Sequence, residues 1–303
     1  MGSAAATAEH TATRSAAIPL AALFVAMLSI QCGAAYAKSL FPAVGAQGVT
    51  ALRLGLSAMI LLPILRPWRA RLSRRHMPAL LAYGVSLGLM NLTFYMALNR
   101  IPLGIAVALE FTGPLTLAVI SSRRRSDFAW IALAVVGLLL LLPIGKMARP
   151  LDPLGVLYAL GAGVGWAMYA VFGKRAGVEH GAAATSIGTA IGALVVVPVG
   201  LAHTGPMLLT LPILLSGVAV AVFSSALPCT LEMVSLTHLP ARVYGTLTSA
   251  EPALGAVAGL VFLHEKLTPL QVVAIAAIVL ASVGTALTLQ PAPKPQDKGL
   301  PTE

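Results

Sequence analysis

The chain has 303 residues, of which 58% are hydrophobic and 10% are charged, and its mean hydropathy is +0.89. Soluble domains contain about 45–50% apolar and about 25% charged residues, so this composition excludes a soluble globular protein and indicates a polytopic membrane protein. The net charge of +10 comes from basic loops beside apolar stretches, a pattern that a lipid bilayer explains without a nucleic-acid partner.

Ten apolar stretches are each long enough to cross a bilayer, which takes roughly 20 residues at a rise of about 1.5 Å each. The first, 18–40, is longer than the roughly 7–15-residue apolar core of a signal peptide, so we interpret it as a membrane span. The others follow in chain order at 46–65, 77–98, 103–121, 128–145, 154–172, 182–201, 212–232, 241–263 and 269–289. We expect a disordered leader over 1–17 and a disordered, proline-rich tail over 290–303.

The basic residues between the spans predict the orientation of the chain. With the N-terminus in the cytoplasm, the cytoplasmic loops contain the arginine clusters of 66–75 and 123–125. The opposite side then receives Arg100, Lys146, Arg149 and Lys266. Because cytoplasmic loops of membrane proteins are the basic ones, both termini are predicted to be cytoplasmic.

The second half of the chain repeats features of the first at a distance of 138 residues. This shift superimposes Pro102 on Pro240, Pro114 on Pro252 and Asp127 on Glu265. Each half, 18–145 and 153–289, holds five spans, and because five is odd the second half enters the membrane upside down. The predicted fold is therefore all-α and integral to the membrane, with ten transmembrane helices arranged as two inverted five-helix repeats. Many secondary transporters have this build, with the substrate site near the midplane between the repeats.

Charged residues inside the spans mark the predicted functional site. Glu110 and Glu251 fall near the middle of the fourth and ninth spans, and Arg53 lies within the second. An ionisable group in the hydrocarbon costs roughly 2.5–3.5 kcal/mol, so these side chains are expected to face a cavity or a partner. Two interpretations stay open, namely a static ion pair such as Glu110 with Arg53, and a site that opens for substrate.

Prolines beside both acids favour a site that opens. Pro114 has no N–H, so the carbonyl of Glu110 loses its helical hydrogen bond. Pro252 has the same effect on the carbonyl of Thr248. Such carbonyls are tolerated in a membrane where protein, water or a ligand bonds them, so the sequence predicts a hydrated central site.

Four further residues are candidates for this site. Lys38 lies near the outer end of the first span, where its side chain either anchors at the interface or binds substrate. Asn91, Tyr95 and Tyr244 carry polar tips that either bind substrate or form hydrogen bonds between helices.

We predict no cofactor, no metal site and no enzyme activity. The spans contain no histidine-rich metal pattern, and Ser224-Ser225 has no nearby histidine base. The two cysteines, Cys32 and Cys229, both fall within spans and are interpreted as small buried hydrophobic residues. Oligomeric state is left open by the sequence.

The paired prolines with a following acid resemble the EamA repeat of the drug/metabolite transporter superfamily. Longer strings are similar to those of the bacterial threonine/homoserine exporters: Ala37-Lys-Ser-Leu-Phe-Pro42, Gly48-Val-Thr-Ala-Leu-Arg-Leu54, Pro102-Leu-Gly-Ile-Ala-Val-Ala-Leu-Glu-Phe-Thr-Gly-Pro-Leu115, Arg175-Ala-Gly-Val-Glu-His-Gly181, Ala226-Leu-Pro-Cys-Thr-Leu-Glu-Met233 and Ser249-Ala-Glu-Pro-Ala-Leu254. The similarity runs from the first span to the last and excludes the leader. It implies a ten-span exporter of small hydrophilic amino acids in the bacterial inner membrane, driven by the proton gradient.

A free amino acid is a zwitterion, so its ammonium needs a carboxylate and its carboxylate needs a cation. We expect Glu110 or Glu251 to hold the ammonium and Arg53, with Lys38, to hold the carboxylate. Glu110 and Glu251 are also the candidates for carrying the proton that exchanges for substrate. Alternatives are export of other metabolites or lipophilic cations and, less favoured, a membrane scaffold or enzyme.

Overall fold

The computed structural model describes residues 2–70, 75, 77–120, 125–141, 151–228, 231, 235 and 251–288. Every regular element in these ranges is a helix, which confirms the predicted all-α class for the described part of the chain. Parts of the predicted spans 128–145, 212–232 and 241–263, and the tail over 290–303, lie outside the described residues.

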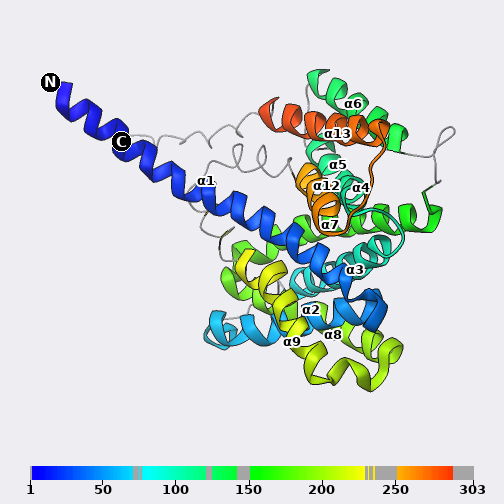
Figure 1. Cartoon of the computed structure of the whole chain (residues 1–303). Helices are drawn as coiled ribbons and strands as arrows, with labels where there is room; N and C mark the ends of the chain where they lie inside the picture. Colours follow the sequence, from blue (N-terminus) through cyan, green and yellow to red (C-terminus); the bar gives the residue numbers. More distant parts are fainter. Residues whose placement is uncertain are drawn as a thin grey trace.

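The helices follow the predicted order of spans (Figure 1). The first half contains α1 (Gly2–Ser39), α2 (Phe41–Leu65), η1 (Pro67–Arg69), α3 (Met77–Leu98), α4 (Leu103–Glu110), α5 (Thr112–Ile120) and α6 (Arg125–Leu141). The second half contains α7 (Pro153–His180), α8 (Ala182–Thr204), η3 (Gly205–Leu209), α9 (Leu211–Ala221), η4 (Val222–Ala226), α12 (Glu251–Phe262) and α13 (Pro269–Thr288).

Five helical segments are long and apolar enough to cross a membrane by length and composition. They are Ile18–Ser39, Phe41–Leu65, Met77–Leu98, Pro153–His180 and Ala183–Leu209. Shorter apolar helices cover Leu103–Leu117, Leu211–Ala226, Glu251–Phe262 and Pro269–Ala281, at the places of four further predicted spans. The total of ten spans and the inverted repeat stay predictions.

Two helices depart from the predicted apolar runs for local reasons. Helix α1 begins at Gly2, before the predicted start at 18, in a leader rich in alanine, the strongest helix former. Helix α2 is interrupted at Gly45, whose φ of 69° is a left-handed value that glycine adopts without strain. Regular helix therefore resumes at Ala46, where the sequence predicts the second span to begin.

The fourth predicted span is divided into α4 and α5 at Phe111. This break confirms the effect expected of Pro114, which cannot donate to the Glu110 carbonyl. The Thr112 hydroxyl donates to the Leu109 carbonyl at 2.6 Å and so bonds a neighbouring carbonyl at the break.

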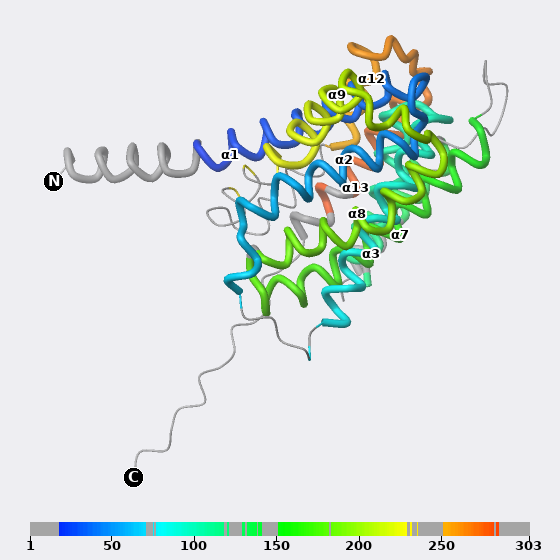
Figure 2. The backbone as a smooth tube through the Cα atoms, turned by 90° about the horizontal axis from the view of Figure 1, so that it is seen from below, coloured from blue at the N-terminus to red at the C-terminus, as the bar shows by residue number. Residues whose placement is uncertain are grey.

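The strongest helix contacts join the two halves of the chain. Helix α2 packs along α8, α3 along α7, α4 against α12, and α6 against α13. Figures 1 and 2 show α3, α7 and α8 side by side, and α7 also contacts α4 and α5. All eight residues of α4 are buried, so this helix forms the centre of the main apolar core.

Gly163 allows α7 to approach the break between α4 and α5. A Cβ added at Gly163 would lie 2.8 Å from the Glu110 carbonyl oxygen and 3.3 Å from the Gly113 nitrogen. We expect Gly163→Ala to lower the free energy of unfolding by about 1–3 kcal/mol, because both neighbours are rigid backbone atoms.

Thermal unfolding of the detergent-solubilised protein tests this expectation. Gly161→Ala is the matched control, since a Cβ there meets nothing within 4 Å and alanine favours the helix. Equal stability of the two variants would contradict the proposed close approach.

Candidate functional site

Arg53 of α2 lies where helices from both halves of the chain meet. Its Nη1 donates to the Tyr95 hydroxyl of α3 at 3.2 Å, and its guanidinium carbon lies 5.4 Å from the centre of the Tyr95 ring. Its Nη2 donates to the Ser224 carbonyl at 3.0 Å, and its Nε donates to the Ser225 hydroxyl at 3.3 Å. The guanidinium therefore connects α2 and α3 to η4, and the partners in these bonds are uncharged.

The element η4 is a π-helix over Val222–Ala226. A π turn shifts backbone bonding by one residue, and such turns occur often at functional sites. Side chains from other helices bond two successive carbonyls of this turn, because Ser29 of α1 donates to Phe223 at 2.7 Å and Arg53 donates to Ser224. Contacts with the first half of the chain thus stabilise η4.

Tyr95 and Asn91, two of the candidate site residues, are both buried on α3. Tyr95 is fully buried and makes edge-on contacts with the rings of Phe41 and Phe94, with centroid distances of 5.9 and 5.7 Å. Asn91 donates from Nδ2 to the Leu87 carbonyl of its own helix at 2.8 Å. Tyr95 therefore contacts Arg53 directly, whereas Asn91 makes a local bond.

Glu110 is the last residue of α4 and is buried. The Arg53 guanidinium is close enough to interact electrostatically with its carboxylate. Among the contacts of the described residues, these two groups form no direct ion pair or hydrogen bond. The static pair considered from the sequence is therefore not in direct contact in this structure.

Glu251 is the first residue of α12 and is also buried. Gln31 of α1 lies nearby, since its Oε1 would be 3.1 Å from a Cβ added at Gly255, one turn beyond Glu251. The second predicted acid is thus placed between α1 and the core. Tyr244, the remaining aromatic candidate, lies outside the described residues.

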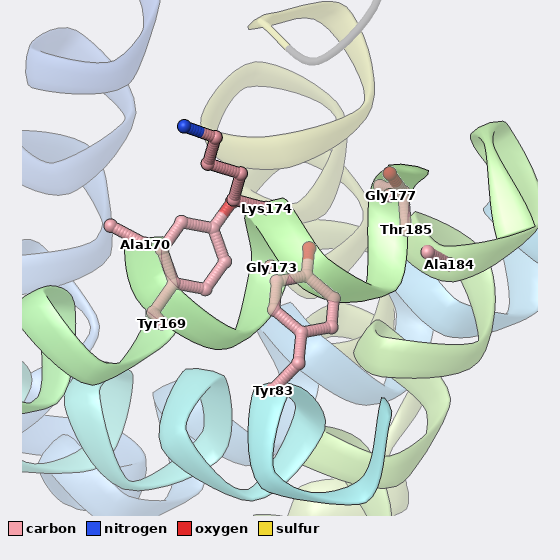
Figure 3. A pocket seen from close by; sticks show the side chains of 8 residues that line it. All are labelled: Tyr83, Tyr169, Ala170, Gly173, Lys174, Gly177, Ala184 and Thr185. Carbon is pink, nitrogen blue, oxygen red and sulfur yellow. The ribbon is translucent and has the colours of Figure 1, made fainter. Parts of the chain in front are cut away.

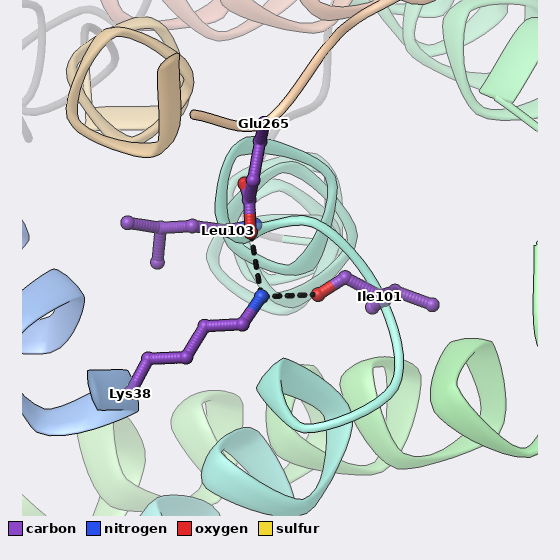
Figure 4. A network of polar contacts seen from close by, with 4 residues as sticks. All are labelled: Lys38, Ile101, Leu103 and Glu265. Atoms are coloured by element: carbon purple, nitrogen blue, oxygen red, sulfur yellow. Dashed lines mark hydrogen bonds and ion pairs between the residues drawn. The ribbon is translucent and has the colours of Figure 1, made fainter. Parts of the chain in front are cut away.

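Lys38 is engaged at the C-terminal end of α1 (Figure 4). Its Nζ donates to Glu265 Oε1 at 2.5 Å and to the Ile101 carbonyl at 3.4 Å. Glu265 Oε2 accepts the Leu103 N–H at 2.8 Å, so the carboxylate also lies at the positive N-terminal end of α4. This network joins α1, the start of α4 and the loop between α12 and α13, and it contains none of the contacts of Arg53.

Asp152 forms a second charged contact, with Arg100 in the loop between α3 and α4 that also contains Ile101. Its Oδ2 accepts from Arg100 Nη1 at 2.7 Å, and its Oδ1 accepts the Leu154 N–H at 2.9 Å, which caps the start of α7. The hydrogen bond from Arg100, with a smaller effect of the Leu154 N–H, lowers the pKa of Asp152 below its ordinary value.

Comparison with known proteins identifies the family. The model of the EamA-like transporter family matches residues 153–287. The threonine/homoserine exporter RhtA of Escherichia coli (strain K12) is 54% identical over 273 residues, which cover 90% of this chain and 92% of that protein. The chain belongs to the EamA-like transporter family.

Further comparisons agree with this family of transporters. The threonine/homoserine exporter RhtA of Salmonella typhimurium (strain LT2) is 52% identical over 277 residues, or 91% of this chain and 94% of that protein. A solved structure described as "Crystal structure of protein" is 20% identical, with a TM-score of 0.60 over 88% of this chain and 96% of that chain. This last likeness supports the fold alone. The family resemblance predicted from the sequence strings is confirmed.

This EamA-like transporter also has an open pocket of about 220 Å³ between α3, α7 and α8 (Figure 3). Tyr83 and Tyr169 stack there with ring centroids 5.0 Å apart. The lining residues are Tyr83, Tyr169, Ala170, Gly173, Lys174, Gly177, Ala184 and Thr185. None of them contacts Arg53, and the pocket lies near the start of α3, at the other end of this helix from Ile101.

Asp152 predicts a pH dependence of stability. Because its folded pKa is lowered, its stabilising contribution is present above the unfolded value of about 3.9 and is lost as the pH falls through the folded pKa. Asp152→Asn should flatten the decrease of the unfolding temperature in this acidic window. A decrease of the same size in both proteins would show that other groups cause it.

Glu265→Gln should lower the free energy of unfolding of the transporter by about 1–2 kcal/mol at pH 7. The amide keeps an acceptor for the Leu103 N–H but removes the charge opposite Lys38. Asp152→Asn is the control, because that pair is more exposed, at 40% and 34% of the two side chains against 23% and 13%. The control should cost less than Glu265→Gln does, and the reverse order would contradict a structural role for Lys38 and Glu265.

Proposed function

We propose that this chain exports small hydrophilic amino acids, including threonine and homoserine, across the cytoplasmic membrane in exchange for protons. The names and the 52–54% identity of the exporters described above support this substrate class. The observation that carries the proposal is the Arg53 guanidinium, held between both halves of the chain by neutral partners, with the buried Glu110 carboxylate near it but not paired with it.

These groups match the charges of a free amino acid. The substrate carboxylate binds Arg53, since a charged acceptor forms stronger bonds than the tyrosine hydroxyl, serine hydroxyl and backbone carbonyl that Arg53 now contacts. The substrate ammonium binds Glu110 or Glu251 at the opposite side of the site. Tyr95 contributes a hydroxyl beside the carboxylate, and Tyr244, Asn91 and Lys38 are secondary candidates.

The pairing of helices supports two inverted repeats over 18–145 and 153–289. Contacts of α2 with α8, α4 with α12 and α6 with α13 each join a predicted span to its counterpart in the other repeat. The contact of α3 with α7 has its own counterpart in the contact of α1 with η4. A pseudo-twofold axis produces this pattern, and rocking of the two repeats about it gives alternating access.

The charged contacts fit a state that is closed at the outer face. With both termini in the cytoplasm, Lys38, Glu265, Arg100 and Asp152 all lie at that face, where they join the loops of the two halves. Outward release of substrate then requires these contacts to separate. A buried acid that accepts a proton from outside favours substrate release, since its attraction for the ammonium is lost.

Glu110→Gln and Glu251→Gln test the proposal. Each variant should lose at least about tenfold in counterflow of labelled threonine in proteoliposomes, because one carboxylate–ammonium bond is removed. An imposed pH gradient should accelerate export by the wild type and have a smaller effect on whichever variant lacks the proton carrier.

Glu179→Gln is the matched control, because Glu179 is an exposed acid near the end of α7. Its export should equal that of the wild type, and the amount of each protein in the membrane should be unchanged. Wild-type counterflow by both central variants would refute the assignment. Transport of lipophilic cations in place of threonine would refute the substrate class.

A further inference from the structure

The Ser224 hydroxyl is a buried polar group that the contacts of Arg53 leave unused. Ser224 is 3% exposed, and its Oγ has no hydrogen-bond partner among the described residues. The carbonyl of the same residue accepts from Arg53, and the hydroxyl of the next residue, Ser225, does so too. An unpaired hydroxyl therefore belongs to the residue whose carbonyl binds the guanidinium that we assign to the substrate carboxylate.

Several other helical hydroxyls of the described residues bond locally, although the buried hydroxyl of Ser57 on α2 also has no partner. The hydroxyls of Thr50, Thr93 and Thr189 each donate to the carbonyl four residues earlier, at 2.8 Å in every case. This local bond is the usual fate of such groups in a helix. Ser224 lies within the π turn and makes no such bond, so its hydroxyl keeps both its donor and its acceptor capacity.

Residues of α1 pack closely against Ser224 and the π turn that carries it. Gly33 of α1 faces it so closely that a Cβ added at Gly33 would overlap the Ser224 Oγ. Ser29, one turn earlier on α1, bonds the Phe223 carbonyl and holds the same π turn against α1. A buried hydroxyl without a partner costs free energy, and a substrate that supplies the partner recovers it on binding.

We propose that Ser224 binds the side-chain hydroxyl of the substrate and so selects hydroxy amino acids over apolar ones of the same size. This inference rests on the proposed function, in which Arg53 holds the substrate carboxylate. The carboxylate and hydroxyl of threonine are separated only by Cα and Cβ, and in this proposal Arg53 binds the first group while Ser224, whose carbonyl Arg53 contacts, binds the second. A site that bonds a substrate hydroxyl discriminates strongly against the analogue lacking it, because its own polar group then stays unpaired.

Threonine and valine have the same shape and differ in this one group, so they are the probes. Unlabelled threonine and valine compete against counterflow of labelled homoserine by the full-length protein in proteoliposomes. In the wild type, threonine should compete at lower concentration than valine. In Ser224→Ala, the half-inhibitory concentration of threonine should rise about 3–10-fold, the loss expected for one hydrogen bond, while that of valine stays unchanged or falls.

Ser29→Ala is the matched control, since it removes a hydroxyl from the same π turn whose bond is to the backbone. It should leave the ratio of threonine to valine inhibition unchanged, whatever it does to the amount of active protein. Ser224→Cys, which keeps the size and weak bonding capacity of the side chain, should give an intermediate ratio and serves if Ser224→Ala is not inserted in the membrane.

An unchanged ratio in Ser224→Ala and Ser224→Cys would overturn the inference. The same change of ratio in Ser29→Ala would also overturn it, because the effect would then come from the geometry of η4. Failure of the proposed function looks different, since the wild type itself would then carry neither homoserine nor threonine.

Discussion

A partly buried cation within an apolar helix bundle is the constraint on which this structure depends. A guanidinium cannot lose its proton at any physiological pH, so the protein must surround it with acceptors. Arg53 obtains them from Tyr95, from Ser225 and from the backbone of Ser224. Because these acceptors belong to α3 and η4, one charge determines how α2 from the first half contacts a helix of the second half.

Two groups of charged side chains among the described residues differ in their partners. Lys38 with Glu265 and Arg100 with Asp152 are direct ion pairs at one end of the bundle, the first between α1 and a loop and the second between two loops. Arg53 and Glu110 lie near each other in the core and interact through space without a direct bond. A direct pair resists separation and suits a contact at the ends of helices, whereas Arg53 and Glu110, which form no direct pair, are the charges that we propose to bind the zwitterion.

Features with a local cause could be predicted from the sequence, and features set by packing could not. The limits of α3, Met77–Leu98, match the predicted span, and the break at Phe111 follows from the missing N–H of Pro114. The π turn carries no comparable sequence signal, because its register depends on Ser29 and Arg53 from other helices.

Long-range partners were equally inaccessible to sequence reasoning. Lys38 binds Glu265, which lies 227 positions further along the chain. The sequence could not predict this partner, so it left open whether Lys38 anchors at the interface or binds substrate. Asn91, by contrast, donates to a carbonyl one turn earlier in its own helix. The sequence pattern does not distinguish such a local bond from a hydrogen bond between helices. The candidates on α2, α3 and α4 were found because a charged or polar residue in an apolar span is rare and has to be explained.

Helix α4 connects two carboxylates mechanically, because Glu265 contacts its first residue and Glu110 is its last residue. Its eight residues span about 12 Å, with the Glu265 carboxylate on the first N–H and Glu110 as the last residue. A short, fully buried α-helix moves as a rigid rod, because bending it would break backbone bonds that nothing nearby replaces. While the hydrogen bond from Leu103 holds, a displacement of the loop carrying Glu265 along the axis of this rod moves Glu110 as well, so the loop and the central acid are coupled over one helix length.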